Sequence, residues 1–231
     1  MTFKIVDLTH TIDEDIPVFP GDPHIRIEKV KNIERDGFNL NYIHMGEHTG
    51  THIGTPLHFI KDGFDTSMIP LELSLVKSIV IDISKKAQLN RNYLLNICDI
   101  EMWEKIHGEI REKCALVRTD WDKFWKTKDY LGIDTHGIMH FPGIKPEAVS
   151  FLIKKGIKII GIDTHGIDGG MSKKFESNKI LFENGGIHIE NLRNLDKLPE
   201  RGFYIFLGSL KIKGGSGSPA RIIALLDTYA Y

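Results

Sequence analysis

Three histidines lie close together in the segment H-T-G-T-H-I-G-T-P-L-H, at positions 48, 52 and 58. Glycine, threonine and proline separate them, and these residue types disfavour a helix. We therefore expect an extended segment in which His48, His52 and His58 share one face, because alternate side chains of an extended chain point the same way. Imidazole is the commonest metal-ligating side chain, so this cluster predicts a metal site, with surface histidines in a glycine-rich loop as the alternative.

Regular elements must hold such a site in place, and the sequence predicts more strands than helices. The strand-like runs are rich in branched or aromatic residues and span 25–30, 39–45, 78–83, 115–119, 157–163, 202–207 and 221–226. The clearest helix is 146–155, with Pro146 at a favoured first position and Gly156 after its end. A weaker helix is expected over 99–105, with Asp99 as its N-cap. The pattern favours one mixed α/β domain over residues 1–231.

Composition excludes several kinds of partner. Thirty basic and 31 acidic residues give a net charge of −1, so neither nucleic acid nor an anionic membrane is an expected partner. Two cysteines are too few for a disulfide framework or a cysteine zinc site. There is no signal-peptide pattern at the start, and no run approaches the roughly 18 apolar residues of a membrane span. We expect a soluble, cytoplasmic protein.

The histidine segment, with motifs along nearly the whole chain, resembles the cyclase family, metal-dependent hydrolases that include bacterial kynurenine formamidase and isatin hydrolase. His48-Thr-Gly-Thr-His52 and Pro56-Leu-His58 match the signature H-x-G-T-H-x-D-x-P-x-H. The other matching motifs are D-L-T-H (7–10), P-V-F-P-G-D-P (17–23), R-T-D-W (118–121), F-P-G-I-K-P-E-A (141–148), G-I-D-T (161–164), E-N-L (190–192) and G-S-G-S-P-A-R (215–221).

The resemblance implies a fold and roles for individual residues. The fold would be the family's swivelling β/β/α type, assembled as a homodimer or larger homo-oligomer such as a tetramer. His48 and His52 would bind the metal, with Glu190 as a further ligand, and His58 would be the general acid/base. Phe19 would line the substrate pocket.

Two positions depart from the family pattern. The signature aspartate, which bridges both ions in two-metal members, is Gly54 here, and the histidine expected twelve residues before Glu190 is Asn178. Glycine offers no side-chain ligand, and a neutral amide is a poor zinc ligand compared with imidazole. We therefore expect one divalent ion per chain, zinc or manganese, rather than two.

Other histidines could replace the missing ligands. The heptapeptide G-I-D-T-H-G-I occurs twice, at 132–138 and 161–167, and places His136 and His165 two residues after an aspartate. Family members commonly read G-I-D-T-P-S-I-D at the second copy, so His165 is unusual. His188 stands two residues before Glu190, which puts both on one face of an extended chain. The competing interpretation is that these are hydrogen-bonded turn residues.

These residues support hydrolysis of a small amide, lactam or ester. A divalent ion lowers the pKa of bound water to about 7 and polarises a carbonyl, while an imidazole with an ordinary pKa of about 6.5 can transfer the proton. The prediction is an arylformamidase-like hydrolase acting on a small molecule. A lyase or dehydratase with an altered metal site, or a non-catalytic binder of small molecules, are the alternatives.

Overall fold

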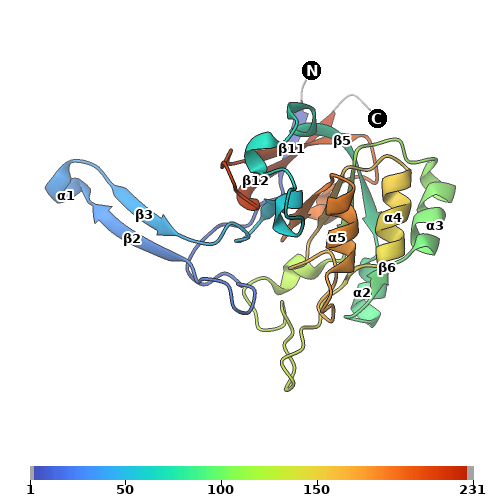
Figure 1. The fold of residues 1–231 in the computed structure, drawn as a ribbon, viewed down its shortest axis with the longest axis horizontal. Helices are drawn as coiled ribbons and strands as arrows, with labels where there is room; N and C mark the ends of the chain where they lie inside the picture. Colours follow the sequence, from blue (N-terminus) through green and yellow to red (C-terminus); the bar gives the residue numbers. More distant parts are fainter. Residues whose placement is uncertain (1–2, 228–231) are drawn as a thin grey trace.

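Strands and helices alternate along much of the chain, which the structure, a computed structural model, describes over residues 3–227 (Figure 1). The strands are β1 (Phe3–Asp7), β2 (Arg26–Lys31), β3 (Leu40–His44), β4 (His52–Gly54), β5 (Leu75–Asp82), β6 (Leu94–Leu95), β7 (Cys114–Arg118), β8 (Gly143–Ile144), β9 (Ile159–Ile162), β10 (Ile187–Glu190), β11 (Phe203–Ser209) and β12 (Gly217–Asp227). The α-helices are α1 (Ile33–Asp36), α2 (Ser84–Leu89), α3 (Ile97–His107), α4 (Pro146–Lys154) and α5 (Glu176–Glu183). The 3₁₀ helices are η1 (Pro56–His58), η2 (Thr66–Met68), η3 (Leu71–Leu73), η4 (Trp121–Phe124) and η5 (Leu195–Lys197). In this part of the chain, no helix has the length and apolar character needed to cross a bilayer.

The main sheet closes on itself to form a barrel. Its strand order is β1-β12-β11-β5-β7-β9-β10-β4, and β4 pairs back onto β12. Strands β5, β7, β9 and β10 run parallel, whereas the remaining pairs are antiparallel. Helices α3, α4 and α5 pack on the outside of the parallel strands (Figure 1). This arrangement confirms the predicted mixed α/β fold of the swivelling β/β/α type.

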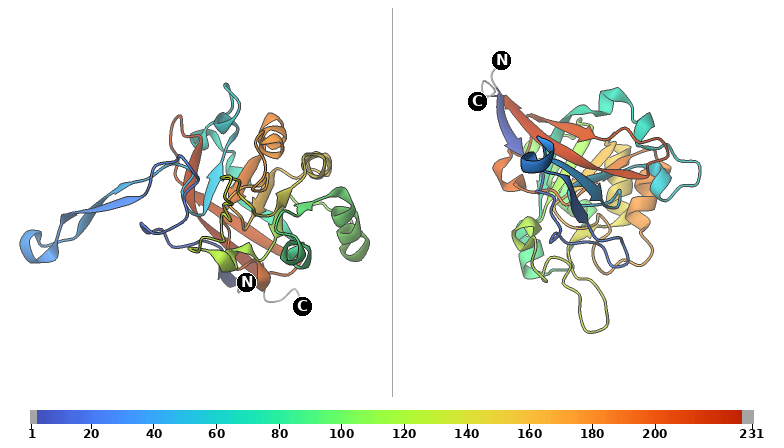
Figure 2. Two further views of the ribbon diagram at one scale, coloured as in Figure 1. Left: turned by 90° about the horizontal axis from the view of Figure 1, so that it is seen from below. Right: turned by 90° about the vertical axis from the view of Figure 1, so that its left-hand side faces the viewer.

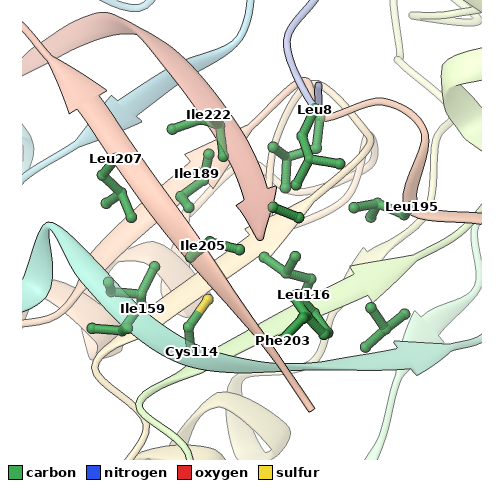
Figure 3. Close-up of a cluster of buried hydrophobic side chains, with 14 of the residues drawn as sticks. Leu8, Cys114, Leu116, Ile159, Ile189, Leu195, Phe203, Ile205, Leu207 and Ile222 are labelled. Carbon is green, nitrogen blue, oxygen red and sulfur yellow. The ribbon is translucent and has the colours of Figure 1, made fainter. Parts of the chain in front are cut away.

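Apolar side chains fill both the barrel and the layer beneath the helices. The barrel interior holds Leu116, Ile189, Ile205 and Ile222, all fully buried (Figure 3). Because successive side chains of a strand point to opposite faces, β9 contributes to both layers. Ile159 packs inside the barrel, and Ile160 and Ile162 pack toward the helices.

The seven predicted strands are confirmed as β2, β3, β5, β7, β9, β11 and β12, and the clearest predicted helix is α4 with Pro146 at its start. Two local predictions were wrong. Asp99 is not the N-cap of α3, because Asn96 caps the helix and Asp99 completes a capping box from the third position. The histidine segment is not one extended stretch, since only β4 is a strand and His58 lies on η1.

Strands β2 and β3, joined by α1, form a two-stranded arm that extends away from the barrel (Figures 1 and 2). Every residue of β3 is exposed, including Tyr42 and Ile43, with 59% and 51% of their surface accessible. An isolated hairpin of this kind is only marginally stable in water, so the arm needs further contacts to stabilise it.

Gly161 provides a test of the packing that sets the position of the loop after β9. A Cβ added there would lie 2.6 Å from Leu116 Cδ2 and 2.8 Å from Leu192 Cδ1, both buried. We expect Gly161→Ala to lower the free energy of unfolding by about 1–3 kcal/mol, because overpacking a tight core forces neighbours to shift. Urea denaturation measures this change.

Gly46→Ala is the matched control, because an added Cβ there would make only ordinary contacts of 3.5 Å or more. Its free energy of unfolding should change by no more than about 0.5 kcal/mol. Equal stabilities of the two variants would contradict the packing described for β9.

Candidate metal centre

The pairing of β4 with β10 brings together residues that lie more than 130 positions apart in the chain. His188 is opposite Gly54, and Glu190 is opposite His52 in the antiparallel register. His188 and Glu190 are two residues apart on a strand, so both side chains point to the same side, as predicted. His48 precedes β4 in a turn and completes the group.

His48, His52 and His188 form a compact cluster. One ring nitrogen of each lies within 4.8 Å of the others, and the His52 and His188 side chains are almost fully buried. The nitrogens His48 Nδ1, His52 Nε2 and His188 Nε2 are buried and have no hydrogen-bond partner among residues 3–227. Leaving a buried polar atom unpaired costs about 1–3 kcal/mol, so this geometry fits a bound cation.

Hydrogen bonds to the other ring nitrogens fix the tautomers of His52 and His188. The Nδ1–H of His52 donates to the backbone oxygen of Gly50 at 2.9 Å, and the Nδ1–H of His188 donates to Oδ1 of Asn178 at 2.7 Å. Each Nε2 therefore presents a lone pair to the cluster. Metal-binding histidines are held by such bonds in many proteins.

A short chain of hydrogen bonds fixes the third imidazole. Ser216 Oγ donates to Oε2 of Glu47 at 2.8 Å, which leaves this hydroxyl oxygen free to accept the Nε2–H of His48 at 3.1 Å. His48 Nδ1 is then the nitrogen that carries the lone pair. All three rings thus present an acceptor to the same small volume.

The charges around the cluster favour a bound cation. Burial lowers the pKa of His188 to about 3 and, together with the neighbouring rings, holds the pKa of His48 well below its usual range. Burial alone would raise the pKa of Glu190, but His188 and His52 reverse this effect and keep it below its ordinary value. Burial therefore favours the neutral forms of His48 and His188, and Glu190 stays ionised, which are the protonation states that bind metals.

Glu190 lies against the cluster, as the sequence predicted for a ligand. Its Oε1 is 3.2 Å from His188 Nδ1, and its Oε2 is 3.4 Å from His52 Nε2. The backbone N–H of Ile167 donates to Oε1 at 3.0 Å and holds the carboxylate in place. Whether Glu190 ligates the ion directly stays a prediction.

His188 occupies the space that the family's aspartate would use. A Cβ added to Gly54 would lie 2.1 Å from His188 Nε2, so the imidazole fits only because residue 54 is glycine. Asn178, the second departure from the family pattern, does not face the cluster as a ligand. It accepts the His188 N–H and donates from Nδ2 to Asp168 Oδ2 at 2.8 Å.

His58 lies next to the cluster at its solvent side. Its ring stacks on that of His48, with centroids 3.8 Å apart and an angle of 28° between the planes. The residue is exposed, although the protein packed around it still lowers the pKa of its imidazole. The stacking places His58 beside the clustered ring nitrogens without making it part of the cluster, which suits proton transfer.

A cavity of about 240 Å³ opens onto the histidines. Phe19 lines it, and its role in holding a substrate stays a prediction. Further aromatic walls come from Phe59, Phe141 and Phe175. Sequence reasoning missed these three residues, although the position of Phe59 directly after His58 was an available signal.

The two copies of the repeated heptapeptide lie in different environments. His165 is 5% exposed and lines the cavity, but within residues 3–227 it does not join the three-histidine cluster. His136 is exposed in a turn, where its backbone N–H donates to Asp134 Oδ1. Of the three proposed replacement ligands, the structure brings only His188 into the cluster.

Comparison with known proteins identifies the class. The fold and the histidine cluster are those of a metal-dependent hydrolase, and a family model described as "Putative cyclase" matches residues 6–169. The chain belongs to the cyclase family. Its identity is 35% with the isatin hydrolase of Roseibium aggregatum, over 96% of this chain and 92% of the relative. It is 26% with a kynurenine formamidase of Bacillus anthracis, over 96% and 97%.

Solved structures agree with this assignment. Isatin hydrolase A from Labrenzia aggregata, bound to benzyl benzoate, superimposes with a TM-score of 0.92 at 37% identity, covering 97% of this chain and 94% of the other. An isatin hydrolase bound to the product analogue thioisatinate gives the same TM-score at 32% identity, with coverage of 98% and 93%. The predictions of cyclase-family membership and of a metal-dependent hydrolase acting on amides are thereby confirmed.

In this chain His188 fills the space beside residue 54, where the family signature has an aspartate. Restoring the aspartate and removing the imidazole tests whether the one side chain replaces the other. We expect His188→Ala to weaken zinc binding on the order of 100-fold or more, because it removes one of three converging nitrogens. The double variant Gly54→Asp/His188→Ala should recover much of the affinity, since a carboxylate then enters the vacated space. Competition with a fluorescent zinc chelator measures both affinities.

Gly54→Asp alone is the control, because its side chain would collide with the His188 ring. It should bind zinc more weakly than the double variant. If the double variant binds no better than His188→Ala, residue 188 does not substitute for the family's aspartate.

Proposed function

We propose that this protein hydrolyses a small aromatic amide with the help of one divalent ion, zinc or manganese, held by His48, His52 and His188 beside Glu190. The observation that carries the proposal is the trio of buried ring nitrogens, all with fixed tautomers and none with a partner among residues 3–227. When bound, a divalent ion polarises a carbonyl and makes water more acidic.

His58 is the group placed to move protons. It stacks on His48 and reaches solvent, so it can take a proton from the attacking water and deliver it to the leaving nitrogen. A pKa below the ordinary histidine value keeps the ring in its basic form at neutral pH. Glu190 contributes negative charge that stabilises a cation at the cluster.

The walls of the cavity favour a flat apolar substrate. Phe19, Phe59 and Phe175 form an aromatic group, with the Phe59 and Phe175 centroids 5.5 Å apart and those of Phe19 and Phe175 6.4 Å apart. Pockets lined in this way bind aryl groups and leave orientation to a few polar side chains. We favour an aryl lactam such as isatin, which the relative at 35% identity is named for hydrolysing.

An arylformamide such as N-formylkynurenine, an intermediate of tryptophan catabolism to kynurenine, is the second candidate. Relatives named kynurenine formamidase and the position of Glu190 support it. The loss of an aspartate at 54 and a histidine at 178 argues against it. The comparisons do not favour a lyase, a dehydratase or a non-catalytic binder.

His58→Ala tests the proposed chemistry. We expect a loss in kcat of about 10²- to 10⁴-fold with unchanged metal content, because the ring transfers protons and is not part of the metal cluster. Hydrolysis of isatin and of N-formylkynurenine, followed by absorbance, gives the rates. Mass spectrometry gives the metal content of protein purified without chelator or polyhistidine tag.

The control is His136→Ala, which removes an exposed histidine outside the cavity and should leave both quantities unchanged. Full activity of His58→Ala would reject its role. The absence of metal and activity from the wild type, even after incubation with excess zinc or manganese, would reject the hydrolase itself.

We also propose that residues 1–231 act as one domain in a cytoplasmic homo-oligomer, a dimer or tetramer. The exposed arm supports the oligomer. Its apolar side chains include Val30, Phe38 and Leu40, each more than 40% accessible in the isolated chain. Exposed apolar patches of this kind commonly mark protein interfaces, and an interface would supply the support that a lone hairpin lacks.

The arm predicts an effect on assembly. Tyr42→Glu/Ile43→Glu should shift the protein toward monomer in multi-angle light scattering, because charges oppose burial of the arm. Lys29→Glu, an exposed arm residue that is already charged, should leave the mass unchanged. A monomeric wild type would contradict the proposed oligomer.

A further inference from the structure

His165 is a buried polar side chain in the cavity wall that has no role in the proposed hydrolysis. It follows β9, is only 5% exposed, and lines the cavity beside Phe19. Both of its ring nitrogens are buried, and neither has a hydrogen-bond partner in the part of the chain that the structure describes. Among residues 3–227 no group offsets the cost of burying this ring, so a molecule bound in the cavity is the partner that would satisfy it.

The surroundings of His165 separate it from the metal cluster. The three clustered nitrogens belong to His48, His52 and His188, and His165 is not among them within residues 3–227. Its neighbours are aromatic, with the Phe19 centroid 5.8 Å away in an edge-on arrangement and the Tyr130 centroid 6.1 Å away. The ring is therefore placed where the body of a flat substrate would lie.

The loop that carries His165 is anchored next to the cluster. The backbone N–H of Ile167 donates to Glu190 at 3.0 Å, and Thr164 Oγ1 donates to the backbone oxygen of Gly166 at 3.1 Å. These bonds hold the imidazole at a fixed position relative to the carboxylate. A fixed donor in an apolar pocket is the arrangement that selects substrates by a single oxygen atom.

We propose that His165 is a specificity-determining residue whose ring N–H donates a hydrogen bond to a second oxygen of the substrate, beside the carbonyl that is attacked. The proposal rests on the proposed hydrolase function. The substrate class is an aromatic amide that carries another carbonyl or carboxylate oxygen close to the scissile bond. A neutral imidazole has one donor and one acceptor nitrogen, so it suits an uncharged carbonyl.

Two probes distinguish this role. Isatin has a ketone next to its lactam carbonyl, whereas formanilide, an aryl amide, has no second oxygen. His165→Phe keeps a ring against Phe19 but removes both nitrogens. We expect a rise in KM for isatin of about tenfold or more, and a change of less than about threefold for formanilide, since one hydrogen bond is lost in the first case alone.

Three further measurements separate recognition from a structural or ligand role. Metal content should stay as in the wild type, and the melting temperature should be unchanged or higher, because an apolar ring replaces an unpaired polar one. His165→Gln, which restores a donor, should recover part of the isatin KM. His136→Phe, the same change in the twin heptapeptide, should alter none of these values.

An unchanged KM for isatin in His165→Phe, or an equal rise for both probes, would overturn the proposal. Loss of metal from His165→Phe would also overturn it and make His165 a ligand. If the wild type hydrolyses neither probe, the hydrolase assignment fails and calorimetric titration of isatin decides instead. A Kd about tenfold weaker in His165→Phe would then support recognition, whereas equal binding, or no binding to the wild type, would reject it.

Discussion

The pairing of β4 with β10 is the contact on which the candidate centre depends. It sets Gly54 opposite His188 and His52 opposite Glu190, so one short ladder positions three of the groups around the proposed ion. The absence of a side chain at Gly54 is what admits the imidazole. In this chain the third imidazole of the cluster thus comes from the neighbouring strand, opposite the position where the signature has an aspartate, and the geometry of the sheet makes this arrangement possible.

Burial of several imidazoles would be costly without the polar groups that hold them. Gly50, Asn178 and Ser216 each satisfy one ring nitrogen and leave the other directed at the common volume. Asn178 replaces a histidine of the family pattern, and a neutral amide is a poor metal ligand. Its side chain instead accepts a hydrogen bond from His188 and donates one to the buried Asp168, so it orients the His188 ring.

Local patterns in the sequence predicted most of the longer strands, because runs of branched residues favour strands independently of distant contacts, but they missed β1 and β10. The local patterns failed where contacts between distant residues determine the secondary structure. Strand β4 has only three residues among glycines and threonines, and it exists because β10 and β12 pair with it. The two identical heptapeptides make the same point: His165 follows a buried strand and faces the cavity, whereas His136 lies in an exposed turn. The heptapeptide itself does not separate the two copies; only the predicted strand over 157–163, which runs into the second copy, distinguishes them.

The closure of the barrel has a consequence for folding. β12 pairs with β4 at the level of His52, and a Cβ added to Gly217 of β12 would lie 2.5 Å from the His48 ring. Strand β4, which closes the barrel by pairing with β12, therefore also carries His52 of the cluster. An ion bound only by the folded chain adds RT ln(1 + [L]/Kd) to the free energy of unfolding. Metal supply would then govern how long the chain persists in the cell, as well as whether it is active.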